Sequence, residues 1–160
     1  MTEIPTKRDG RKENANATQA ALQSAALRWF SGQGFEKAPV GSICADAGVT
    51  VGALYHHYGD KKGLFAAVVE QVDAQLVQAA MAASQAVIQK GGGAWDAFLA
   101  SIDTVLQAGT NAPMRRLMLV DAPAVLGAQV WGDIRQRQGL GAMRGSIAAI
   151  QSHGIFQGHD

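Results

Sequence analysis

Residues 50–61 bring together side chains whose types suit contact with a polyanion. They carry hydroxyl, imidazole and ammonium donors next to two residues with little or no side chain: Thr50, Gly52, Ala53, Tyr55, His56 and Lys61. Such donors bind phosphate oxygens, which set the position of a protein on a duplex but not its sequence preference. A glycine or alanine lets the backbone approach a base edge, and an alanine methyl can contact a thymine methyl. We expect these six residues to face double-stranded DNA.

Three short helices would position these side chains. The pattern predicts a helix over Val40–Ala47, a turn at Gly48, a second helix capped by Thr50 that ends near Tyr58, and a third helix capped by Asp60. Glycine enters left-handed conformations freely, and threonine is a favoured N-cap. Two short helices joined by a tight glycine turn form a helix-turn-helix. The second helix is slender enough for a major groove ~12 Å wide, with His57 also expected on its outward face.

A longer helix precedes this motif. From Thr18, apolar residues fall at steps of three or four up to Phe30, which predicts an amphipathic helix. Its apolar face and the motif would share a small core with Phe35, Ile43, Ala47, Val49, Leu54 and Phe65. Residues 18–66 are therefore predicted to form a DNA-binding domain. Residues 1–17 are polar and aperiodic, and we expect a flexible basic arm carrying Lys7, Arg8, Arg11 and Lys12.

Residues 67–160 are predicted to form a second helical domain. Helical patterns cover 60–90, 94–107, 114–120 and 123–138, with a break near Asp121–Pro123, and another begins at Gly139. Strand-like alternation is absent, so the fold class is all-α. The glycine triplet Gly91–Gly93 follows no strand and precedes no Lys-Ser/Thr pair, so it is interpreted as a loop and not as a phosphate-binding motif.

Composition narrows the function classes. Hydrophobic residues make up 48% and charged residues 17%, and 14 basic residues against 13 acidic ones leave a net charge of +1, so DNA contact would require local clustering of charge. A single cysteine, Cys44, excludes an intrachain disulfide and favours a reducing compartment. We expect a cytoplasmic protein with no membrane span, because no secretory leader is present and no apolar run approaches ~20 residues.

His56, His57 and Cys44 are residue types that can also serve other chemistry. His56 and His57 are adjacent, so on a helix they point ~100° apart and chelate one ion poorly. Cys44 has no partner cysteine and is interpreted as a packing residue. No catalytic motif or nucleotide fingerprint is present. We therefore expect no enzyme activity, no metal site and no cofactor.

The quoted residues resemble a known family. Gly34-Phe35, the pattern IxxxAGVTxGxLYHHYxxKxxLF from Ile43 to Phe65, and LxxAAxxxF from Leu22 to Phe30 are similar to the DNA-binding domain of TetR/AcrR-type transcriptional regulators. The resemblance implies a homodimer with a three-helix head on each subunit and an all-helical domain for dimerisation and ligand binding. It also implies that Thr50, Gly52, Ala53, Tyr55, His56 and Lys61 match DNA-facing positions.

The implied ligand is a small apolar or amphipathic effector. Aromatic and methionine side chains of the second domain are candidates to line its cavity, although core packing is their usual role: Trp95, Phe98, Met114, Met118, Trp131 and Met143. Arg115-Arg116 is a candidate contact for an acidic ligand group, or simply a solvated face.

Two functions follow from the resemblance. The first is a repressor that leaves a palindromic operator when the effector binds. The second is a shortened, regulator-like interaction module that heterodimerises or no longer binds DNA. The second arises because the chain ends where the first of the family's two C-terminal dimer helices would begin. The chain also has Ala38-Pro39 and Gly41 where the family often has Thr-Thr and a basic or polar residue. From these departures we expect weaker DNA affinity, or more reliance on the basic arm.

Overall fold

The computed structural model describes residues 7–152, and within that range helices are joined by turns and short loops, with no strand. The predicted all-α class is confirmed. The chain divides into an N-terminal unit, Met1–Val68, and a C-terminal unit, Val69–Asp160. The division falls inside one long helix, near the boundary that the sequence suggested after residue 66.

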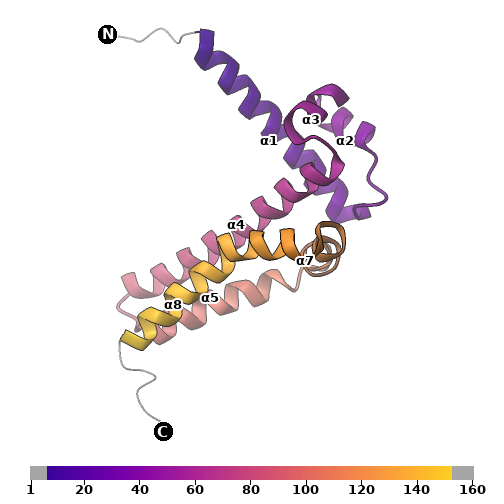
Figure 1. The fold of residues 1–160 in the computed structure, drawn as a ribbon. Helices are drawn as coiled ribbons and strands as arrows, with labels where there is room; N and C mark the ends of the chain where they lie inside the picture. The colour runs from indigo at the N-terminus through magenta and orange to yellow at the C-terminus, as the bar shows by residue number, and fades with distance from the viewer. Residues whose placement is uncertain (1–6, 153–160) are drawn as a thin grey trace, which may run out of the picture. The chain divides into compact units, whose positions relative to one another are not determined.

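Three helices and the start of a fourth make up the N-terminal unit (Figure 1). They are α1 (Lys7–Gln33), α2 (Val40–Ala47), α3 (Val51–Tyr58) and the first residues of α4 (Lys61–Gln89). α1 packs against both α2 and α3. The indole nitrogen of Trp29 donates to a carboxylate oxygen of Asp46 at 2.8 Å, which ties α1 to α2.

The first helix begins earlier than predicted. α1 starts at Lys7 and not near Thr18, so residues 7–17 are helical where a flexible arm was expected. Helix formers such as Lys, Arg, Glu and Ala dominate this segment, and they favour a helix even without apolar periodicity. The Thr18 hydroxyl donates to the Asn14 carbonyl at 2.9 Å, inside the helix. Residues 1–6 and the side chains of residues 7–12 lie outside the described part of the chain.

A dense apolar core holds the N-terminal unit together. Its aromatic centre joins three elements, because the Phe65 ring lies 5.1 Å from Phe30 and 5.0 Å from Phe35, centroid to centroid. Both contacts are edge-on, a favourable geometry for aromatic pairs. Ile43 and Leu54 are fully buried, as predicted, whereas Phe35, Ala47 and Val49 are half-buried at the edge.

The C-terminal unit takes the rest of α4 and a run of shorter helices. These are α5 (Ala94–Ala108), α6 (Ala112–Arg116), the π-helical turn η1 (Leu117–Asp121), α7 (Ala122–Arg135), the π-helical turn η2 (Gln136–Leu140) and α8 (Gly141–Ser152). α4, α5 and α8 run alongside one another in this unit, and α5 packs against α8 (Figure 1). Gly91 ends α4 with φ 85°, and its amide donates to the Ile88 carbonyl at 2.9 Å.

The predicted break near Asp121–Pro123 is wrong. Helical backbone continues through Pro123, which occupies the first turn of α7, and the chain kinks instead at Gly127 (φ 80°, ψ 164°). The turn before Pro123 is π-helical, with the Ala122 amide bonded to the Leu117 carbonyl. A proline ring clashes with the carbonyl four residues earlier in an ordinary α-helix. A local π turn alters that spacing, so the helix absorbs the proline without ending.

One described segment has the length and composition of a membrane span. Ala112–Gly139 contains an 18-residue window with mean hydropathy 1.2, contrary to the expectation that no such run exists. It is interrupted by the kink at Gly127 and carries a half-buried Asp121 beside the Arg116 guanidinium at 3.6 Å. Length and composition are therefore weak evidence for a span here.

Candidate nucleic-acid interface and ligand cavity

The turn between α2 and α3 sets the direction of α3. Gly48 is left-handed (φ 66°, ψ 29°), and its amide donates to the Ala45 carbonyl at 3.1 Å, as predicted for the tight turn. Pro39 stands at the N-cap of α2 and gives no side-chain cap. The Thr50 hydroxyl accepts from the Ala53 amide at 3.2 Å, which confirms the predicted cap of α3.

One side of α3 is anchored to the unit. Leu54 is fully buried. The Tyr58 hydroxyl donates to the Gln19 carbonyl of α1 at 3.3 Å, and burial raises the pKa of that hydroxyl. The His57 ring nitrogen Nδ1 lies 3.5 Å from the Gln19 amide nitrogen. His57, expected on the outward face, is therefore half-buried against α1, because its position follows Leu54 by one turn.

The opposite side of α3 is open. Thr50, Gly52, Tyr55 and His56 are exposed, and Ala53 is half-buried. Val51, which sequence reasoning left out, is 42% exposed beside Tyr55 at 51%. They are the large apolar side chains that the described N-terminal unit leaves in solvent, and their spacing of four residues places them on one face. That spacing is the signal that could have found Val51.

Gly52 has no role in internal packing. A methyl group there would meet a single atom, the Thr50 hydroxyl oxygen, at an ordinary distance of 3.8 Å. Glycine in a helix costs free energy relative to alanine. Since no described residue around position 52 requires a glycine there, its use fits an external reason, such as close approach of the backbone to another molecule.

The ammonium group of Lys61 contacts neighbouring protein groups and does not extend freely into solvent. Its Nζ is 3.4 Å from the Glu36 carbonyl oxygen and 4.5 Å from the centre of the Phe35 ring. An ammonium has three donors, so this placement still leaves capacity for a phosphate. Asp60 caps α4 as predicted, because its Oδ1 accepts from the Gly63 amide at 2.6 Å.

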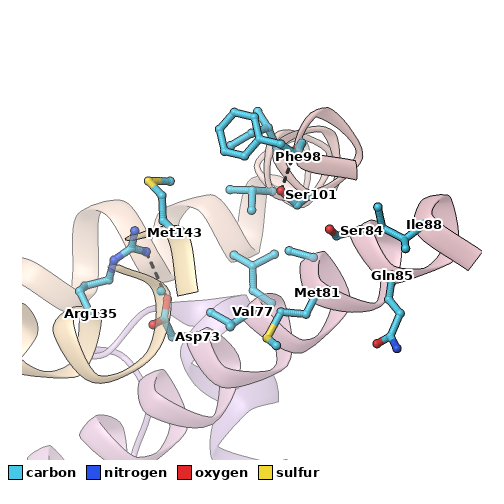
Figure 2. A pocket seen from close by; sticks show the side chains of 15 residues that line it. Asp73, Val77, Met81, Ser84, Gln85, Ile88, Phe98, Ser101, Arg135 and Met143 are labelled. Carbon is cyan, nitrogen blue, oxygen red and sulfur yellow. Dashed lines mark hydrogen bonds and ion pairs between the residues drawn. The ribbon is translucent and has the colours of Figure 1, made fainter. Parts of the chain in front are cut away.

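The C-terminal unit holds a cavity of about 460 Å³. Its wall is mostly apolar and comes from α4 and α5, with contributions from α7, η2 and α8 (Figure 2). The α4 residues on the wall repeat every three or four positions from Asp73 to Ile88. This volume lies within the range of about 300–1,000 Å³ typical of small-molecule sites.

An ion pair between a buried carboxylate and a partly exposed guanidinium stands in the cavity wall. Asp73 is 1% exposed, and its Oδ1 accepts from the Arg135 guanidinium at 3.2 Å. Burial raises the pKa of the Asp73 carboxyl, against the lowering effects of Arg135 and the nearby Gly139 amide. The second oxygen, Oδ2, is also buried. The Arg135 guanidinium lies 5.5 Å from the centre of the Trp131 ring.

The ligand candidates taken from the sequence fall mostly outside this cavity. Phe98 and Met143 line it. Trp95, Met114, Met118 and Trp131 do not. Met118 is buried in the core, whereas Trp95 is 41% exposed. Most of the wall was missed because the apolar repeat of α4 looks the same whether it faces a core or a cavity.

Arg115 and Arg116 have local roles. Arg115 donates to the Gly109 carbonyl at 2.9 Å, and Arg116 pairs with Asp121. Neither lines the cavity, so the structure does not place them against a ligand. Cys44 is 2% exposed in the N-terminal core, and burial raises the pKa of its thiol. Both features fit the predicted packing role.

Known protein families match the N-terminal and the C-terminal unit separately. Residues 22–68 match the family of bacterial regulatory proteins named tetR, and residues 95–160 match the tetracyclin repressor-like C-terminal domain. A TetR-family transcriptional regulator from Pectobacterium atrosepticum, solved as a crystal structure, is 31% identical, with a TM-score of 0.74 over 98% of this chain and 75% of that one. The chain belongs to the TetR family.

Other proteins similar to this chain are also described as transcriptional regulators. A transcriptional regulator from Pseudomonas aeruginosa PAO1 is 25% identical, with a TM-score of 0.65 over 89% of this chain and 69% of that one. The curated regulators AcrR of Shigella flexneri and UidR of Escherichia coli K12 are 42% and 33% identical over 59 and 63 residues. Those stretches cover 37% and 39% of this chain but only 27% and 32% of the two relatives. Membership of the TetR family places the chain among transcription regulators and not among enzymes.

Proposed function

We propose that this TetR-family protein is a cytoplasmic repressor that binds a palindromic operator through α3 and leaves it when a small apolar or amphipathic effector fills the cavity. The observation that carries the proposal is the open outer face of α3. Thr50, Gly52, Tyr55 and His56 are exposed beside a fully buried Leu54. A well-anchored helix with a small, polar outer face fits a major groove.

Different residues take different parts in DNA binding. Gly52 and Ala53 let the backbone of α3 approach the base edges. Tyr55, His56 and Lys61 donate to phosphates and set the register. The free amides at the start of α3, next to Thr50, attract a further phosphate. The basic residues between Lys7 and Lys12 add affinity through release of counterions.

A homodimer would carry two such helices. Half-sites on one face of a duplex lie about 34–36 Å apart, one helical turn, so a dimer reads a palindrome. The ligand acts by favouring the dimer state whose spacing mismatches the operator, which requires different affinities for the two states. α4 supports this coupling, because it supplies residues to both the N-terminal unit and the cavity wall.

Selection from a pool of random duplexes tests the DNA-binding part. Ala53→Arg should change the enriched sequence, because position 53 faces the bases. Tyr55→Ala and Lys61→Ala should keep the enriched sequence and weaken binding to all duplexes alike, with a salt slope reduced by about 1 for Lys61→Ala. Lys90→Ala removes the same charge from an exposed position in the C-terminal unit and should leave binding unchanged.

Two outcomes would overturn this assignment. Unchanged affinity and preference in Ala53→Arg would mean that α3 does not read the bases. A salt slope near zero in the wild-type protein would instead favour the interaction module, which binds partner proteins and not DNA.

A further inference from the structure

The cavity wall carries its charge at one end. Of the described residues that line the cavity, Asp73 and Arg135 are the charged ones, and Figure 2 shows them paired, with the neutral Ser84 and Gln85 further along α4. Between these ends the α4 wall consists of apolar side chains: Leu76, Val77, Ala80 and Met81. A molecule that fills this cavity therefore contacts carbon along most of its length and the charge pair at one end.

The two members of the pair differ in what they offer to an occupant. The side chain of Asp73 is 1% exposed, whereas that of Arg135 is 37% exposed. The Asp73 carboxylate already has partners, because the Arg135 guanidinium and the Gly139 amide both hydrogen-bond to it. The carboxylate is therefore closed to a molecule in the cavity, and the guanidinium is the charge that such a molecule can reach.

The guanidinium of Arg135 has donors beyond the one that Asp73 uses. Arginine carries N–H groups on every nitrogen of a planar fork, which matches the two oxygens of a carboxylate. Among the described residues, the hydrogen-bond partner of Arg135 is Asp73, reached by Nη1 at 3.2 Å. The Trp131 ring, 5.5 Å from the guanidinium carbon, supports the cation through its π face and takes no N–H from the fork. A second anion can thus bind Arg135 without displacing Asp73.

A glycine keeps the other terminal nitrogen of the fork uncovered. Gly139 lines the cavity beside the pair, and the first carbon of a side chain there would lie 3.9 Å from Nη2 of Arg135. Any longer side chain at position 139 would compete with an occupant for the space next to that nitrogen. The approach to Nη2 is therefore left to a ligand.

The lining also indicates the shape of the ligand. The α4 residues on the wall run from Asp73 to Ile88, which at ~1.5 Å per residue is roughly 22 Å of helix. Phe98, Ile102 and Val105 of α5 also line the cavity. An elongated apolar chain suits this wall better than a compact polar molecule.

Resting on the ligand-binding part of the proposed function, we propose that the effector is an amphipathic carboxylate whose head accepts hydrogen bonds from the Arg135 guanidinium while its apolar chain lies along α4. An ammonium head would face the like charge of Arg135, and the carboxylate that could attract it is closed off. Burial raises the pKa of Asp73, which favours its protonated form and so reduces the repulsion between Asp73 and a second carboxylate.

Probes that share one chain and differ in head charge test this assignment. Octanoate, octanol and octylamine are titrated separately into the full chain at pH 7 and followed by calorimetry. We expect octanoate to bind about 10-fold more tightly than octanol, the scale of a charge-assisted hydrogen bond that is partly open to water. Octylamine should bind most weakly of the three.

Two variants at the charge pair sharpen the test. Asp73→Asn removes the neighbouring negative charge and keeps the guanidinium, so octanoate should bind more tightly than to the wild-type protein. Asp73→Asn combined with Arg135→Gln removes both charges without leaving a buried ion unpaired. This double variant should lower octanoate affinity by about 10-fold, to the level of octanol, and leave octanol affinity unchanged.

The chain offers a matched control pair. Glu70 and Arg137 also join α4 to η2, with 3.0 Å between their charged atoms, but neither lines the cavity. Glu70→Gln combined with Arg137→Gln removes the same two charges and should leave the affinities for all three probes unchanged.

Other results would overturn the inference. Equal affinity for octanoate and octanol, tightest binding of octylamine, weaker octanoate binding in Asp73→Asn, or a double variant that still prefers octanoate would show that Arg135 does not select the head group, while the cavity would remain a binding site. If none of the probes bound, the ligand part of the proposed function would fail as well, and DNA binding would still be judged by the duplex selection. Should the double variant fail to fold, the ranking of the probes on the wild-type protein and the gain in Asp73→Asn decide.

Discussion

The two units bury their apolar side chains very differently. In the N-terminal unit the core side chains are fully closed to solvent, including Leu22, Phe30 and Leu54. In the C-terminal unit a cavity of about 460 Å³ opens beside α4, and many large apolar side chains of the described residues are exposed, such as Leu106 at 66% and Leu119 at 63%. One unit is packed to hold a fixed shape, and the other keeps open space and apolar surface.

A single helix shows both environments. Leu64, Phe65 and Val68, near the start of α4, are fully buried, whereas Met81 and Ile88 further along are 59% and 50% exposed. The apolar repeat of the sequence does not change along the helix, so the difference comes from what packs against it. Dense packing around α3 suits a surface that must keep its geometry on DNA. A lined cavity in the other unit suits a site that must admit a ligand.

The largest expected effect tests this contrast directly. Leu54→Ala should lower the free energy of unfolding by about 2–5 kcal/mol, because it opens a cavity in a closed core. Leu106→Ala removes the same atoms from a side chain already in solvent and should change stability by less than about 0.5 kcal/mol. Urea unfolding followed by circular dichroism measures both. Equal losses of unfolding free energy in the two variants would show that Leu106 is buried in a closed core. The two units would then not differ in packing as described.

The next effect concerns the charge pair at the cavity. Arg135→Gln leaves the buried Asp73 without its cation, and since Arg135 is about one-third exposed, water reduces the loss to about 1–3 kcal/mol at pH 7. Burial already raises the pKa of Asp73 above its ordinary value of 3.8, so the folded chain holds a proton where the unfolded chain has released it. The contribution of Asp73 to the free energy of unfolding therefore falls as pH rises through its raised pKa.

The loss of unfolding free energy in Arg135→Gln should accordingly be smaller at a pH near or below the raised pKa of Asp73 than at pH 7, because protonated Asp73 no longer needs the guanidinium. Arg137→Gln is the matched control, since its pair with Glu70 at 3.0 Å is exposed on both sides. That change should cost less than about 1 kcal/mol. Unfolding curves of both variants at both pH values measure these losses of unfolding free energy. A loss in Arg135→Gln that does not change with pH would rule out ionised Asp73 as its cause.

The same contrast explains what the sequence could predict. Three local signals placed the N-terminal elements: Gly48 for the left-handed turn, and Thr50 and Asp60 as caps, each confirmed by its own backbone geometry or hydrogen bond. Such signals work because each cap or turn involves residues within four positions of one another. His57 was misplaced since its contact, Gln19, is 38 residues away.

The C-terminal unit depended on contacts distant in sequence. Asp73 and Arg135 are 62 residues apart, and no local pattern predicts that they meet. Of the aromatic and methionine candidates, Phe98 and Met143 reached the cavity, because exposure to a cavity is decided by neighbouring helices and not by residue type. Pro123 was interpreted as a break, although a π-helical turn lets the helix continue through it. These are tertiary effects that override local propensity.

The smallest expected effect separates the packed interior of the N-terminal unit from its open face. Gly52→Ala adds a methyl group that meets only the Thr50 hydroxyl oxygen at 3.8 Å, so it should stabilise the fold by about 0.5 kcal/mol through helix propensity. If the backbone of α3 approaches DNA as proposed, the same methyl should weaken binding to the selected duplex. A more stable protein that binds DNA less well has no explanation in folding alone.

Gly63→Ala is the matched change inside the packed region. A methyl group at position 63 would collide with the Tyr58 carbonyl, which is backbone and cannot swing aside. We expect a destabilisation of about 1–3 kcal/mol, as for other overpacked sites. Urea unfolding and duplex binding of both variants give the comparison. If Gly52→Ala destabilised the fold as Gly63→Ala does, α3 would have an internal packing demand at position 52, and the argument for close DNA approach at that glycine would fail.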